Sequence, residues 1–305
     1  MPFSLFDLCV IMSKIHVPNE VKRVSRKNIF EMMAEIFDVS IELDRMYRLF
    51  EKRAMICINH KYYTLRDYIN LQGFSRWSNR GRCIDMNDFL SLVEYDKLWS
   101  GAKIDVQDLF TLIEIIYNFW HIADRKVDAS HGSGDTVRDF RLLKKIMDDC
   151  LAHYNYKGEY FWDLERLIVI EDKPEATAVA EIVDNETGYK VLRYNHYMLK
   201  GDLQAKKDIL LALGTNLEPK REQIKAIDKN LEDGIFYILN NLHLRHNNKC
   251  ERDKNFRQAV ADMDSATLEN WYDELYQMLL LAYLQLDQVE RNTRFKTLKQ
   301  MVTPK

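Results

Sequence analysis

The chain has 305 residues, of which 47% are hydrophobic and 30% are charged, with only 10 glycines and 5 prolines. This length can bury a sizeable core and favours two domains over one, and so few glycines and prolines leave little room for linkers or disorder. The formal net charge of -3 excludes a strong overall field, so a nucleic acid or a membrane would have to be held by a local patch.

Cysteine usage indicates a reducing compartment, and the lack of long apolar runs argues against a membrane-spanning helix. The five cysteines are scattered and form no C-x-x-C pair, which argues against a disulfide framework. The stretch from Pro2 to Met12 follows no basic residue and precedes no small-residue cleavage site, and even the apolar segment Leu109–Trp120 contains Glu114 and Asn118. We therefore expect a cytoplasmic protein with no membrane partner.

Helical spacing dominates the first half of the chain. Apolar residues recur at intervals of three and four within Ile29–Phe37 and again within Ile41–Phe50, which predicts two consecutive helices. Thr64 is placed to cap a brief helix that runs through Leu71, and Asp85 stands where another N-cap belongs.

The segment Asp105–Arg125 is apolar around most of its circumference, which predicts a central core helix with Asp105 as its cap. The polar loop Asp128–Gly134 ends it. Asp135 or Thr136 then caps another helix, whose apolar face extends to Leu151.

The middle of the chain has a different pattern. Leu167–Ile170 is a short aliphatic run, and Ala178–Val183 and Tyr189–Leu192 are rich in β-branched residues. The latter two flank the turn-like sequence Asp184–Gly188. This arrangement predicts a small β-hairpin near residues 178–194.

Helical spacing returns in the last third. Pro219 suits the first turn of one long helix that carries apolar residues from Ile224 to Leu242. A charged loop follows, and after Asp264 or Ser265 as cap a final helix carries an apolar face from Leu268 to Val289. We expect these two long helices to pack antiparallel.

Together these patterns predict a mainly α fold, with two helical domains or subdomains and a small β-hairpin between them. The predicted N-terminal helical domain spans residues 1–165, the hairpin or connecting segment spans 166–196, and the C-terminal helical domain spans 197–305.

The segment from Asn240 to Asn248 is the most unusual local composition, because many hydrogen-bonding side chains follow an apolar helix. Such a cluster can hold a phosphate or another polar partner. Alternatively, the basic residues complement the helix dipole and an asparagine caps the helix end. The candidate binding residues here are Asn241, Arg245, His246, Asn247 and Asn248.

The order of a long apolar helix, the polar junction Asn241–Asn248, a charged loop and a closing helix from Leu268 resembles the HEPN helical domains of bacterial abortive-infection proteins. The resemblance covers the last third of the chain. Catalytic members of that superfamily place four to six residues between an arginine and a following histidine, but Cys250, Glu251 and Arg252 stand at those positions after Arg245. The resemblance therefore implies a binding or dimerising copy without the nuclease signature.

A pair with that spacing occurs elsewhere, at Arg125 and His131. His131 could act as general acid or base toward a ribose hydroxyl while Arg125 neutralises the phosphate, as in a metal-independent ribonuclease. Such a spacing also arises by chance, and a glycine-containing loop is poorly suited to hold a catalytic geometry.

A second candidate binding segment is the loop after Phe74, which contains Arg76, Trp77, Arg80 and Arg82. Arginines interleaved with aromatic rings are typical of single-stranded nucleic acid binding. The alternative is that the rings fill the core while the arginines pair with nearby acids, and the sequence favours this alternative.

No metal site and no cofactor are predicted, since the spacing of His243, His246 and Cys250 lacks a fourth ligand and no phosphate-binding glycine loop occurs. The leading hypothesis is a non-enzymatic helical protein that binds RNA or a protein partner, of the abortive-infection type that the resemblance implies, with a homodimer through the C-terminal helices as a further possibility. The alternatives are the ribonuclease and a purely structural interaction module.

Overall fold

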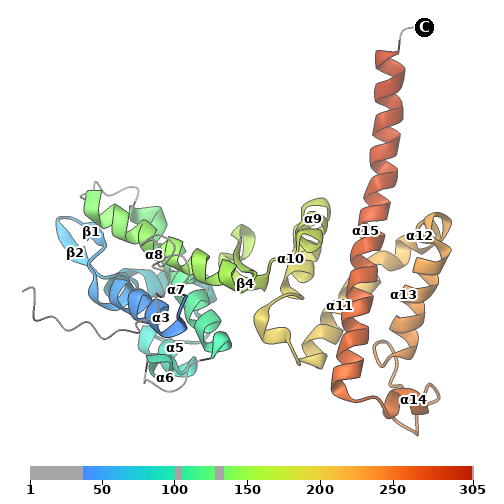
Figure 1. Cartoon of the computed structure of the whole chain (residues 1–305), viewed down its shortest axis with the longest axis horizontal. Coiled ribbons are helices and arrows are strands. Elements are labelled where there is room, and N and C mark those ends of the chain that lie inside the picture. Colours follow the sequence, from blue (N-terminus) through green and yellow to red (C-terminus); the bar gives the residue numbers. More distant parts are fainter. Residues whose placement is uncertain (1–36, 100–104, 128–133, 304–305) are drawn as a thin grey trace, which may run out of the picture.

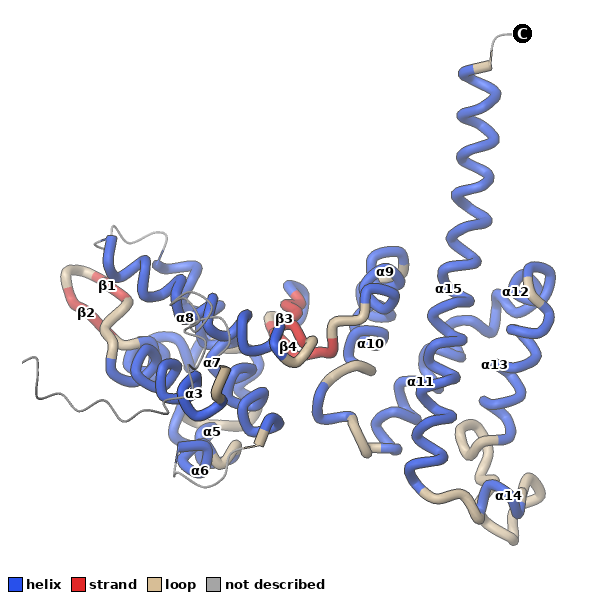
Figure 2. Tube along the Cα trace, in the orientation of Figure 1, coloured by secondary structure: helices blue, strands red, loops and turns tan. Residues whose placement is uncertain are grey.

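A computed structural model describes residues 37–99, 105–127 and 134–303, and within them the protein is mainly α-helical, as predicted. The strands form two small antiparallel sheets of two strands each, shown in red in Figure 2. None of the described helices combines the length and the apolar character that crossing a bilayer requires. The predicted helix Ile29–Phe37 lies, except for Phe37, outside the described residues.

The elements of the first half surround one long helix, α7 (Figure 1). They are α3 (Val39–Tyr47), β1 (Ile56–Ile58), β2 (Lys61–Tyr63), α4 (Leu65–Tyr68), α5 (Met86–Leu92), α6 (Tyr95–Trp99), α7 (Val106–Val127) and α8 (Gly134–His153).

The second half begins with a hairpin and continues as a series of helices. Its elements are β3 (Tyr156–Phe161), β4 (Arg166–Glu171), α9 (Pro174–Ile182), α10 (Asn185–Arg193), α11 (Leu203–Leu217), α12 (Arg221–Ile227), α13 (Lys229–Asn241), α14 (Gln258–Ala261) and α15 (Ser265–Val302).

The N-caps expected at Thr64, Asp85 and Asp105 are confirmed, because each side chain accepts a hydrogen bond from a backbone N–H in the first turn of its helix. Thr64 accepts from the N–H of Asp67 at 3.0 Å, and Asp85 and Asp105 accept from residues three positions later at 2.9 Å. At the last helix Asp264, and not Ser265, is the cap. These bonds satisfy donors that the helix itself leaves unpaired. The cap expected at Asp135 or Thr136 is wrong, since α8 already begins at Gly134.

The hairpin predicted at residues 178–194 is wrong, since this region forms α9 and α10. Asp184 does not open a hairpin turn but caps α10, accepting from the N–H of Thr187 at 3.0 Å and from its hydroxyl at 2.7 Å. Pro174 occupies the first turn of α9, where its missing N–H has no helical partner to lose. The hairpin lies earlier instead, and its second strand β4 contains the aliphatic run Leu167–Ile170.

The single helix predicted from Ile224 to Leu242 is also wrong. It breaks at Asp228, whose extended backbone ends α12 and whose carboxylate caps α13 by accepting from the N–H groups of Asn230 and Leu231 at 3.0 Å. Both pieces pack on α15, and α13 lies antiparallel to it, as expected for the two long helices (Figure 1).

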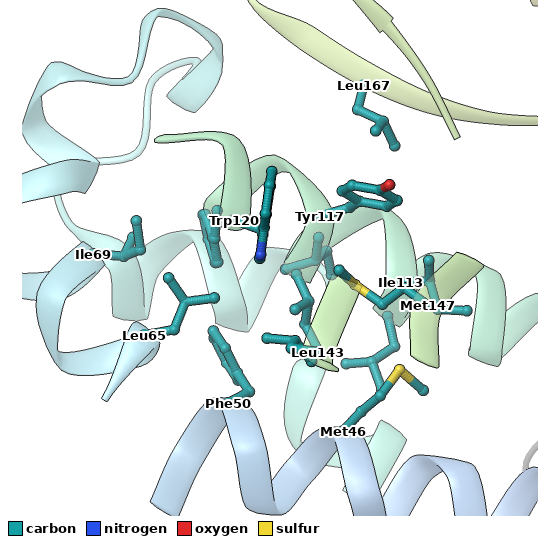
Figure 3. Packing of buried hydrophobic residues seen from close by; sticks show 14 of the residues in the cluster. Met46, Phe50, Leu65, Ile69, Ile113, Tyr117, Trp120, Leu143, Met147 and Leu167 are labelled. Carbon is teal, nitrogen blue, oxygen red and sulfur yellow. The ribbon is translucent and has the colours of Figure 1, made fainter. Parts of the chain in front are cut away.

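Buried side chains form two hydrophobic clusters, and strand β4 contributes to both. Leu167 and Val169 belong to the first cluster, around α7, whereas Ile168 and Ile170 belong to the second, around α15. Figure 3 shows Leu167 above the ring of Tyr117 on α7. Because successive side chains of a strand point to opposite faces, one short strand can serve two cores.

The edge of β4 that faces away from β3 is closed by side chains of α7. Asn118 donates to the carbonyl of Leu167 at 3.0 Å and accepts from its N–H at 2.9 Å. Glu114, one helical turn earlier, accepts from the N–H of Val169 at 2.7 Å and lies 2.9 Å from the Nε2 of His196. These two polar residues in an apolar helix therefore replace a third strand.

A buried lysine holds α11 against α15. The ammonium of Lys206 lies 2.8 Å from Glu269 and 2.7 Å from Asp273, and the hydroxyl of Tyr194 donates to Asp273 at 2.8 Å. Burial, followed by the charge of Asp273, raises the pKa of Tyr194, which keeps this phenol protonated as a donor. The lysine is thus paired, as a buried charge must be.

We predict that Asn118→Leu lowers the free energy of unfolding by roughly 2 to 4 kcal/mol, because it keeps the volume but leaves a buried N–H and a buried carbonyl of Leu167 without partners. Chemical denaturation measures this change. Gln107→Leu, on the exposed side of the same helix, is the control and should change stability by less than about 0.5 kcal/mol. Equal losses in the two variants would contradict the role assigned to Asn118.

Candidate functional site

A groove of about 770 Å³ lies between the β3–β4 hairpin and the helices α9 and α10. The hairpin contributes one wall, which includes the turn Trp162–Leu164, and the two helices contribute the other. Its volume lies within the range of ordinary ligand pockets. Because the groove is open, it suits a polypeptide segment lying along it better than a small molecule that must be enclosed.

Trp162 is the most exposed aromatic side chain of this groove, with 69% of its surface accessible. It stands at the hairpin turn, edge-on to the ring of Tyr160 at 4.8 Å between centroids. Tyr160 in turn stacks on His121 of α7 at 4.1 Å. The exposed indole is therefore supported from below by rings that belong to the first core, which limits its freedom before any partner binds.

The polar lining of the groove is mostly acidic. Four carboxylates line it, against one guanidinium, that of Arg166; they are Glu159, Asp163, Glu181 and Glu186. Glu186 pairs with Lys190 at 2.6 Å one helical turn away. Within the described part of the chain, Asp163 and Glu181 have no cationic partner. These two carboxylates can accept a cation from outside.

Arg166 offsets only one of these four negative charges, and its hydrogen bonds go to neutral groups. One terminal nitrogen donates to the side-chain oxygen of Asn79 at 2.8 Å and the other to the hydroxyl of Tyr189 at 3.4 Å. Its Nε is buried without a hydrogen-bond partner. The arginine thus connects the hairpin to the loop before α5 and to α10, and it leaves the acidic character of the groove intact.

The floor of the groove is held by close packing. Phe161 meets Tyr189 of α10 edge-on at 4.9 Å, and Gly188 lets α10 approach α9 closely. A Cβ at Gly188 would lie 3.0 Å from the carbonyl oxygen of Ala180. Because that neighbour is backbone, any side chain at position 188 would push the helices apart and change the width of the groove.

Aromatic faces beside unneutralised carboxylates favour cationic ligands. A lysine or arginine head can pair with a carboxylate and lie over an indole face, while its aliphatic stem covers apolar surface. A phosphate backbone would meet repulsion from the same carboxylates. The groove therefore has the chemistry of a site for a basic polypeptide segment.

The polar junction Asn241–Asn248 is largely consumed by internal bonds. Asn248 is fully buried, and its amide oxygen accepts from the N–H of His243 at 2.8 Å while its nitrogen donates to the carbonyl of Asn255 at 2.8 Å. Asn241 donates to a carbonyl of its own helix. His246 and Asn247 are exposed.

Arg245 has partners of its own. Its guanidinium pairs with Glu218 and lies over the ring of Phe236, with 5.5 Å to the centroid. The nearby His243 has a lowered pKa, first because of burial and then because Lys207 and Lys249 repel its charged form. The junction thus connects the end of α13 to the turn Glu218–Lys220, which precedes α12. Most of its hydrogen-bonding groups are already used inside the protein.

The loop from Arg76 to Arg82 separates its rings from its charges. Trp77 packs against Phe74, Phe89 and Phe119 in the first core, with ring centroids 5.3 to 6.0 Å apart. Arg80 donates to the carbonyl of Cys83, while Arg76 and Arg82 are exposed. The indole is therefore not available for stacking on a base.

The structure leaves the pair Arg125 and His131 untested. Arg125 is in the last turn of α7, but its side chain is outside the described part, and His131 lies in the segment 128–133, also outside it. The catalytic hypothesis for this pair stays a prediction.

Sequence reasoning did not find the groove, because its residues are spread over residues 159–192 and form no motif. The available signal was weak: Trp162 and Leu164 alternate with the acids Asp163 and Glu165 directly before β4. Comparisons with family models, with curated proteins and with solved structures find no match to this chain.

We predict that Asn248→Ala destabilises the protein by about 2 kcal/mol or more, since it leaves buried backbone groups of the loop unpaired. The adjacent Asn247→Ala, at an exposed position, should stay within about 0.5 kcal/mol of the wild type. Thermal or denaturant unfolding of the two variants provides the measurement. A stable Asn248→Ala variant would return this residue to the set of candidate ligand contacts.

Proposed function

We propose that this protein is a non-enzymatic binding protein that takes a basic, partly apolar segment of a protein partner in the groove between the β3–β4 hairpin and α9–α10. The observation that carries the proposal is the exposed Trp162 in a groove that is also lined by Asp163 and Glu181, two carboxylates without a cation in the described part of the chain. An indole next to such carboxylates favours a lysine or arginine over any anionic ligand.

This proposal selects the protein partner over RNA among the alternatives that the sequence left open. The sequence features that favoured an RNA partner are weaker in the structure, because Trp77 is packed in the core and Arg245 is paired with Glu218. An acidic groove also lowers the local concentration of phosphate by repulsion. The kinship with abortive-infection proteins stays a prediction of the resemblance alone.

The partner segment is expected to be helical or extended with apolar side chains between its basic ones. Phe161, Leu164 and Tyr189 give the groove an apolar lining. Without a bound partner, this apolar surface stays in contact with water. Binding would gain from this apolar area and from charge pairing at the rim, and the charge contribution would decrease with added salt.

Fluorescence anisotropy of a labelled peptide rich in lysine, arginine, phenylalanine and leucine tests the proposal. We expect binding to the full chain that weakens as salt rises. Trp162→Ala should weaken it at least tenfold, since an exposed aromatic anchor commonly contributes about 2 kcal/mol. Glu181→Lys should weaken it about fivefold to tenfold, because it removes one attraction and adds one repulsion of up to roughly 1 kcal/mol each.

Asp233→Lys is the matched control, because Asp233 is an exposed helical carboxylate on α13, outside the groove, and the change in net charge is the same. A peptide with glutamate in place of its basic residues and a single-stranded RNA serve as competing ligands. Preference for the RNA, or peptide binding that neither groove substitution alters, would reject the proposal.

A further inference from the structure

The last helix extends well beyond the body of the protein. α15 spans 38 residues, and its buried face ends at Leu286. The part beyond Leu286 continues for about 24 Å at the helical rise of 1.5 Å per residue, and Figure 1 shows it leaving the body as a single helix. Every residue from 288 to 302, here called the α15 tail, is exposed.

The α15 tail is basic and carries an apolar stripe. Its four basic residues stand against one acid, Glu290; they are Arg291, Arg294, Lys296 and Lys299. Phe295, Leu298 and Val302 are 53%, 48% and 70% exposed and lie at positions i, i+3 and i+7 of one helical face. Arg294 and Lys299 flank this stripe on opposite sides. An isolated helical segment gains nothing from such a stripe in water, so the stripe indicates a partner surface.

Neither a second α15 tail nor the protein's own groove fits this stripe. Two tails side by side would bring basic residues against basic residues, and like charges on adjacent helices repel. The tail continues the straight course of α15 away from the helices α9 and α10 of its own chain (Figure 1). An acidic, aromatic surface on another molecule would complement both the apolar stripe and its basic flanks.

We infer that the α15 tail binds the acidic groove of a second copy of this chain. This inference rests on the proposed function of the groove and names its occupant. Arg294 and Lys299 would meet the carboxylates Asp163 and Glu181 of the groove, while Phe295 and Leu298 would cover Trp162 and the apolar floor. Both surfaces are on one chain, so two copies can exchange tails reciprocally, which closes the assembly as a two-fold dimer.

Charge-swap variants of the full chain test this inference by sedimentation velocity and light scattering. The wild type should be a dimer. Arg294→Glu with Lys299→Glu should give a monomer, and Asp163→Lys with Glu181→Lys should do the same. The variant that combines all four substitutions restores opposite charges and should dimerise again, with its dissociation constant at least tenfold below that of either double variant. Asp233→Lys with Lys229→Glu, two exposed changes on α13, should leave the dimer intact.

Several results would overturn the inference: a monomeric wild type, a dimer that persists in the tail variant, or a quadruple variant that stays monomeric. A monomeric wild type that sediments with phosphatidylserine vesicles through its tail would assign the stripe to a lipid surface instead.

A second measurement separates this inference from the proposed function. A synthetic peptide of residues 288–303 and a scrambled peptide of equal composition are titrated onto the Arg294→Glu, Lys299→Glu variant, whose groove is intact. Binding of the native peptide at least fivefold tighter than that of the scrambled peptide supports docking of the tail in the groove. Equal binding of both peptides, with a monomeric wild type, would reject the self-docking and keep the groove as a site for basic segments. Binding of neither would reject both.

Discussion

Strand β4 has a neighbouring strand on one side only. The packing in the middle of the molecule depends on which groups provide hydrogen-bond partners for the backbone along the other edge of this strand. A buried backbone N–H without a partner costs free energy comparable to a lost hydrogen bond. Glu114 and Asn118 meet this requirement from one face of α7, and the carbonyl of Asn195 accepts from the N–H of Glu171 at 2.9 Å farther along the same edge. The position of α7 against the hairpin, and hence the stacking of Tyr160 on His121, follows from these bonds.

Local signals were sufficient for the helix starts but not for the strands. An N-cap is decided by a side chain and a backbone group three residues away, so Thr64, Asp85 and Asp264 could be predicted from spacing alone. The β-branched residues near Asp184 favoured a hairpin, yet burial of one helical face of α9 and α10 outweighed that preference. Strand β3 shows no alternation because both of its faces are partly buried.

The candidate site was beyond prediction for a related reason. The conspicuous polar residues Asn248 and Arg245 are used inside the protein, where hydrogen bonds and an ion pair consume their donors. The groove residues are ordinary in sequence, and only the fold gathers them. The helical break at Asp228 was likewise hidden, because the apolar spacing of three and four continues through it on both sides.

The two faces of β4 connect the energies of the two cores. Leu167 and Val169 contribute to one hydrophobic cluster, while Ile168 and Ile170 contribute to the other. Any displacement of the strand therefore disturbs the packing of both clusters. Withdrawing the strand would expose apolar area in both halves at once and would break the bonds to α7. The two halves are thereby thermodynamically linked, because each cluster stabilises the other through the shared strand. Unfolding is therefore expected to proceed as one cooperative transition.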